Sequence, residues 1–133
     1  MKELTALALL AIAVVSVAAL VSGAGYLDVV LPGGLPAGNA VAAIGLVSAA
    51  AVPVPLSAPG SVLRVAALAT LGASMAWLPA SIALAGNLAL NFTGWRGSIW
   101  LGFSLITHLA VLCTLAWALV CRCLAIRRGA SAA

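Results

Sequence analysis

The placement of the eight charged residues constrains this chain more than any other feature of its sequence. They leave four uncharged runs, of 24 residues (4–27), 35 (29–63), 31 (65–95) and 25 (97–121). A membrane-spanning helix needs about 20 largely apolar residues, so each run can hold one span. Only 6% of the residues are charged, whereas a soluble domain carries about 25% to cover its surface. The chain is therefore predicted to be an all-α integral membrane protein, which excludes a soluble enzyme, a nucleic-acid binder and a disordered tail.

Prolines, glycines and capping residues predict the limits of the spans. We expect one domain over residues 1–133 with four transmembrane helices at approximately 4–21, 38–56, 62–90 and 98–121. The apolar stretch of the first span is longer than the 7–15 residues usual in a signal peptide, so an uncleaved helix is expected rather than cleavage after Ala24.

The second and third spans each contain proline. Two prolines and four glycines in residues 24–38 predict a loop, after which Asn39 can cap the second helix. Pro53 and Pro55 interrupt that helix, so it must run through them, sit in a thinned membrane or be re-entrant. Ser61 is expected to cap the third helix, and Pro79 inside it predicts a kink.

Charge and aromatic side chains predict the orientation. An even number of spans puts both termini on one side, together with five of the six basic residues: Lys2, Arg64, Arg122, Arg127 and Arg128. The positive-inside rule makes that side cytoplasmic. The alanine bias is typical of bacteria, so we expect a multi-pass protein of the inner (plasma) membrane. Amphipathic rings favour the membrane interfaces, and those expected there are Tyr26, Trp95 and Trp100 outside and Trp117 inside.

Asp28 and Arg96 are the two charges predicted on the outer face, one in each outer loop, and we expect them to form an ion pair. The basic residues otherwise form no patch or stripe, so no nucleic-acid partner is expected. The three cysteines are Cys113, Cys121 and Cys123. Cys121 and Cys123 have no nearby histidine or acidic residue to complete a metal site, so small apolar packing is expected rather than a bound metal.

His108 is the titratable group in the middle of a span, about 15 Å along the fourth helix from Ser98. Charging an imidazole at that depth is costly, so we expect a neutral ring that hydrogen-bonds inside the bundle. The expected partners are on the third helix near Pro79: the carbonyl of Met75 or the hydroxyl of Ser74 or Ser81. The alternative roles for His108 are binding of a ligand or pigment and proton transfer.

The tract from Ser104 to Thr114 resembles the spanning helix of purple-bacterial light-harvesting chains. In those chains a small residue four positions before a histidine makes room for a bacteriochlorophyll whose magnesium the histidine binds. The resemblance covers about eleven residues, and the antenna chains span the membrane once, so we assign no family. It makes bacteriochlorophyll, beside haem, a possible cofactor at His108.

Small residues recur at every fourth position, in a pattern that lets helices approach closely where water provides no driving force. The predicted helix-packing positions are Gly72, Ala76 and Ala80 on the third helix, Gly45 and Ala49 on the second, and Ser98 and Gly102 on the fourth. The sequence leaves open whether they pack internally or against another subunit.

The absence of a second histidine and of any membrane-embedded carboxylate predicts that the chain is not an autonomous enzyme. The first functional hypothesis is a non-catalytic subunit that packs in, and stabilises or assembles, a larger inner-membrane complex. Two alternatives are a homo-oligomeric channel, transporter or holin-like pore, and a cofactor-holding membrane subunit that uses His108.

Overall fold

Four long helices dominate the fold, shown in a computed structural model that describes residues 1–32, 35–85 and 94–130. They are α1 (Lys2–Val21), α2 with its short continuation α3 (Ala37–Ala51 and Pro53–Leu56), α4 (Val62–Ala85) and α5 (Gly94–Ala130). All four are long and apolar enough to cross a membrane. The prediction of four apolar helices of spanning length is confirmed, and the predicted continuation of the third span to residue 90 lies outside the described residues.

The second span runs through its prolines. α2 ends at Ala51, α3 begins directly at Pro53, and together they form one apolar segment of 20 residues. At 1.5 Å per residue this segment is about 30 Å long, enough for the hydrocarbon core. Proline is tolerated in a first helical turn because its missing N–H has no partner there. At the end of α3, the Arg64 guanidinium donates to the Val54 carbonyl at 3.1 Å.

The starts of α2 and α4 differ in how well they were predicted. The N–H of Arg64 donates to the Ser61 hydroxyl at 3.2 Å, which confirms Ser61 as the cap of α4. Asn39 does not cap α2, because the helix already begins at Ala37, after Pro36 in an extended conformation. The preceding loop contains a 3₁₀ turn, η1 (Gly25–Asp28), and an antiparallel pair of two-residue strands, β1 (Val30–Leu31) and β2 (Leu35–Pro36).

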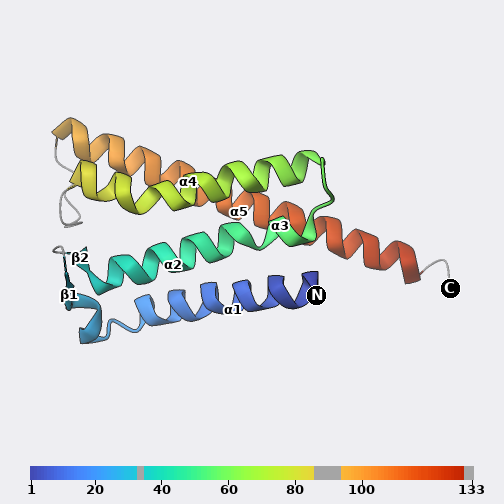
Figure 1. The fold of residues 1–133 in the computed structure, drawn as a ribbon, viewed down its shortest axis with the longest axis horizontal. Coiled ribbons are helices and arrows are strands. Elements are labelled where there is room, and N and C mark those ends of the chain that lie inside the picture. Colours follow the sequence, from blue (N-terminus) through green and yellow to red (C-terminus); the bar gives the residue numbers. More distant parts are fainter. Residues whose placement is uncertain (33–34, 86–93, 131–133) are drawn as a thin grey trace.

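The helices pack in the order α1, α2, α4, α5, and α1 and α5 hardly touch one another. The start of α1 and the end of α5 lie at the same end of the bundle, where α5 projects beyond the other helices (Figure 1). At this end Arg122 of α5 donates to the carboxylate of Glu3 in α1. The four-span prediction that the two ends share a side agrees with this arrangement.

The interior is built from small and hydroxylated side chains, whereas large aliphatic ones face outward. The buried polar residues are all serines and threonines, and many of the leucines, valines and isoleucines are exposed. Trp77 and Trp100 are the large side chains of the core, where they pack with Leu46 and Val111. This distribution suits a bundle in lipid, because a hydrocarbon solvent does not drive aliphatic side chains inward.

Candidate functional site

Two tryptophans and two serines form a hydrogen-bonded cluster between α4 and α5. The indole N–H of Trp77 donates to the Ser104 hydroxyl at 2.9 Å, and that of Trp100 donates to the Ser81 hydroxyl at 2.7 Å. Ser81 in turn donates to the Trp77 carbonyl at 2.6 Å. The two indole centroids are 6.5 Å apart. We call these four residues the indole–serine cluster; it pairs polar groups that hydrocarbon could not satisfy.

His108 lies directly beside this cluster. Its Nδ1 is 2.7 Å from the carbonyl oxygen of Ser104, and its ring meets that of Trp77 edge to face at a centroid distance of 5.9 Å. Ser104 therefore orients two rings, one through its hydroxyl and one through its carbonyl. The histidine was expected to bond to the third helix near Pro79. Its hydrogen-bond partner is instead on its own helix, one turn back, and its contact with α4 is the Trp77 ring.

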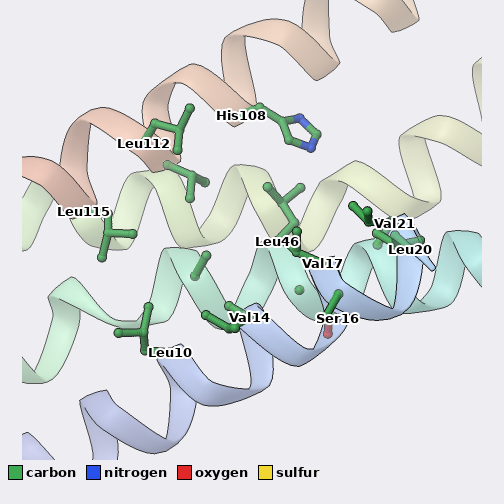
Figure 2. A pocket seen from close by; sticks show the side chains of 16 residues that line it. Leu10, Val14, Ser16, Val17, Leu20, Val21, Leu46, His108, Leu112 and Leu115 are labelled. Atoms are coloured by element: carbon green, nitrogen blue, oxygen red, sulfur yellow. The ribbon is translucent and has the colours of Figure 1, made fainter.

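A pocket of about 590 Å³ opens next to His108, between α1, α2 and α5. α1 and α5 both pack against α2 and hardly touch each other, which leaves this space between them. Sixteen residues line it, of which Ser16 and His108 alone have polar side chains. In the view of Figure 2, the His108 ring extends from α5 and Leu46 of α2 lies between it and the α1 side chains of Val17 and Val21.

The small-residue positions divide into an internal and an external set. Gly45 is buried, and a Cβ added there would lie 2.8 Å from the Ser16 Cβ, so this glycine allows α1 and α2 to approach. Gly72 and Ala76 of α4 are exposed, and a Cβ at Gly72 would meet nothing within 4 Å among the described residues. Positions of intermediate exposure are Ala49, Ala80 and Gly102, while Ser98 is exposed. Pro79 lies inside α4, and the kink stays a prediction.

The charged pair expected on the outer face is not formed among the described residues. The Arg96 guanidinium donates instead to the Ala83 carbonyl near the end of α4, where a helix leaves carbonyls without intrahelical partners. The ion pair that the structure shows, Glu3 with Arg122, joins residues 119 positions apart and was not anticipated. The available signal was the presence of opposite charges near the two ends of the chain, which the four-span topology puts on the same side of the membrane.

The tryptophans expected at the interfaces differ in their surroundings. Tyr26, Trp95 and Trp117 are exposed, as interfacial rings would be. Trp100 is only 7% exposed and points into the bundle, where its N–H finds the Ser81 hydroxyl. Trp77, the central ring of the cluster, was not singled out from the sequence. The spacing of serines and tryptophans on two neighbouring spans was the signal that could have found it, because a buried indole N–H needs an acceptor.

Cofactor chemistry at this site depends on His108. Among the described residues, no group of three histidine, cysteine or acidic side chains could hold a metal ion, and all three cysteines are exposed. The histidine ring is nevertheless held as ligating histidines are held, with one nitrogen on a backbone carbonyl and the other turned away from it.

The four apolar helices and their polar interior define a multi-pass membrane protein. Comparison of the chain with protein families, curated proteins and solved structures finds no significant match.

Proposed function

We propose that this chain is a non-catalytic subunit that packs within a larger complex of the inner membrane and stabilises or assembles it. The observation that carries the proposal is the outward face of α4. Ala69, Gly72 and Ala76, which we call the outward α4 ridge, are all exposed and lie along one face of the helix. A ridge of this kind lets a second helix approach closely, which is how spanning helices associate in lipid.

The comparison of Gly72 with Gly45 supports this use of the ridge. The space beside Gly45 is occupied by the Ser16 side chain of α1. A Cβ at Gly72, in contrast, would meet no atom of the described residues within 4 Å. Against lipid a glycine contributes little contact surface, and in a helix it costs about 1 kcal/mol relative to alanine. If a partner helix packed on the outward α4 ridge, Gly72 would allow that helix to approach closely, as Gly45 allows α1 to approach α2.

The placement of the titratable groups supports a non-catalytic role. Glu3 is paired with Arg122 at one end of the bundle, and Asp28 lies in η1, in the loop that follows α1. The contacts of His108 are the Ser104 carbonyl and the Trp77 ring. General acid–base chemistry needs a second titratable group within hydrogen-bond reach of the first, and neither carboxylate serves His108 in this way.

We also propose that both termini face the cytoplasm. Lys2, Arg64, Arg122 and Arg127 belong to the end of the bundle that carries the termini, and Arg96 begins α5 at the opposite end. Positive charge is retained on the cytoplasmic side during insertion, which supports this orientation.

The test is affinity purification of the tagged chain from its native membrane, with the double variant Gly72→Leu, Ala76→Leu beside the wild type. Leucines on the ridge should reduce the recovery of specific partner proteins at least tenfold, while the helical content of the chain is unchanged. Ala116→Leu is the matched control, because Ala116 is exposed on α5, away from the ridge. Equal recovery of all proteins by the double variant would refute the proposal. Co-purification of only a second, differently tagged copy would favour a homo-oligomer instead.

A further inference from the structure

We propose that the pocket between α1, α2 and α5 binds a neutral, lipid-soluble molecule whose hydroxyl group donates a hydrogen bond to Nε2 of His108. This inference concerns a ligand site and is independent of the outward α4 ridge. It depends on the state of the His108 ring, on the way the ring is held, and on the size and polarity of the pocket.

The hydrogen bond of Nδ1 determines what Nε2 can do. A carbonyl oxygen only accepts, so the 2.7 Å contact with Ser104 requires the proton on Nδ1. A neutral imidazole carries one N–H, and Nε2 is then a lone-pair acceptor on the other side of the ring. Among the described residues no donor reaches Nε2. An unpaired acceptor in hydrocarbon is costly, because no water is present to satisfy it.

The ring is also held in place before any ligand binds. Its Nδ1 is tied to the Ser104 backbone, and its flank rests on Trp77 at a ring angle of 83°. Trp77 is itself fixed by its bond to the Ser104 hydroxyl. The His108 ring therefore loses little conformational freedom when a ligand donor bonds to Nε2. This small entropy cost favours binding.

The size of the pocket selects a slender molecule. Its α1 wall extends from Leu10 to Val21, about 16 Å along the helix axis. The volume of the pocket is about 590 Å³. Pockets for small molecules commonly measure about 300–1,000 Å³, so an aliphatic chain with one ring or one alcohol group fits the space.

The polarity of the pocket selects a neutral molecule with a donor. No charged side chain is among the sixteen residues that line it. The carboxylates of a haem, or a phosphate at this depth, would have no cationic partner there, and burying an unpaired charge is very costly. A ketone or ether offers only acceptors, which would oppose the Nε2 lone pair. An alcohol or phenol on a hydrocarbon body matches both the walls and the acceptor.

The single histidine of the chain makes the test direct. Protein labelled with ¹⁵N-histidine and purified in detergent gives one pair of ring nitrogen signals, which report the tautomer and any hydrogen bond to Nε2. The probes are 4-dodecylphenol and its methyl ether, which differ in the donor. We expect the proton on Nδ1 without probe, and a saturable shift of the Nε2 signal with the phenol. The ether should bind at least tenfold more weakly.

A pair of variants separates the pocket from the surrounding detergent. Val14 and Val15 are adjacent, exposed residues of α1, and only Val14 lines the pocket. Val14→Trp should abolish the phenol-dependent shift, while Val15→Trp should retain it. Equal shifts with phenol and ether, a proton on Nε2 in the free protein, or an unchanged response of Val14→Trp would each overturn the proposal. So would a visible band, in protein from the native membrane, that His108→Gln abolishes, because a metal would then occupy Nε2.

Discussion

The hydrogen bond between Trp77 and Ser104 should contribute measurably to the stability of the α4–α5 pair. Replacing Ser104 with alanine removes the acceptor of an indole N–H that is 2.9 Å away, on a ring only 6% exposed. The backbone carbonyl of Ser104 remains, so the bond to His108 is kept. The substitution therefore isolates one interhelical hydrogen bond.

The size of the effect follows from the burial of the donor. Leaving a buried donor unpaired costs about 1–3 kcal/mol in soluble proteins. In membranes the unfolded reference state also finds partners, and interhelical hydrogen bonds measured by double-mutant cycles in another helical bundle average about 0.6 kcal/mol, with a maximum near 1.7. We expect Ser104→Ala to lower the free energy of unfolding by about 1 kcal/mol, and a coupling of about 0.5–1.5 kcal/mol with Trp77→Phe.

The assay is reversible unfolding by sodium dodecyl sulfate in mixed micelles, followed by far-ultraviolet circular dichroism, for the two single variants and the double variant. Thr114→Val serves as a control, because the Thr114 hydroxyl donates to the Ala110 carbonyl of its own helix, ten residues from Ser104. Its effect on the free energy of unfolding should be additive with that of Trp77→Phe. A coupling between Ser104 and Trp77 indistinguishable from zero would show that the cluster does not hold α4 to α5.

Two further predictions concern helix approach and topology. Gly45→Ala should destabilise the bundle, because its Cβ would lie 2.8 Å from that of Ser16 and overpacking costs about 1–3 kcal/mol. Gly102→Ala is the control and should not destabilise it, because the space around Gly102 is open. Equal unfolding midpoints of the two variants would contradict the close approach of α1 and α2. In a cysteine-free background, a cysteine at Ala58 should react with impermeant reagents only from the cytoplasm and one at Gly25 only from outside, because positive charge orients the spans. Labelling of both from one side would exclude the four-span topology.

Much of the fold could be predicted because its determinants are local. Uncharged runs long enough to span hydrocarbon predict four helices, and the described part of the chain contains four of that length. Ser61 was expected to cap α4 and does so. The possibility that the second span continues through Pro53 was one of three, and the sequence could not choose among them. The structure shows helix on both sides of Val52, at α2 and α3, and how this segment sits in the bilayer stays a prediction.

Contacts between helices could not be predicted in the same way. The Asp28–Arg96 pair was inferred from charge alone, but the nearby Ala83 carbonyl offers Arg96 a partner on the helix beside it. His108 was expected beside the third helix and its ring does contact Trp77 of α4, yet its hydrogen bond is to Ser104. Such choices depend on distances of a few ångströms between side chains far apart in sequence.

The sequence by itself determined four apolar helices long enough to span a membrane and the capping residue of one of them, Ser61. The tertiary structure alone decided which face of each helix is buried: Trp100 turns inward, Gly45 packs against α1, and Gly72 remains outside. The physical reason is that lipid is as apolar as the interior of the bundle, so hydrophobicity does not distinguish the two faces of these helices. Close packing of small residues and the pairing of hydroxyl and indole groups distinguish them, and both require the neighbouring helix to be in place.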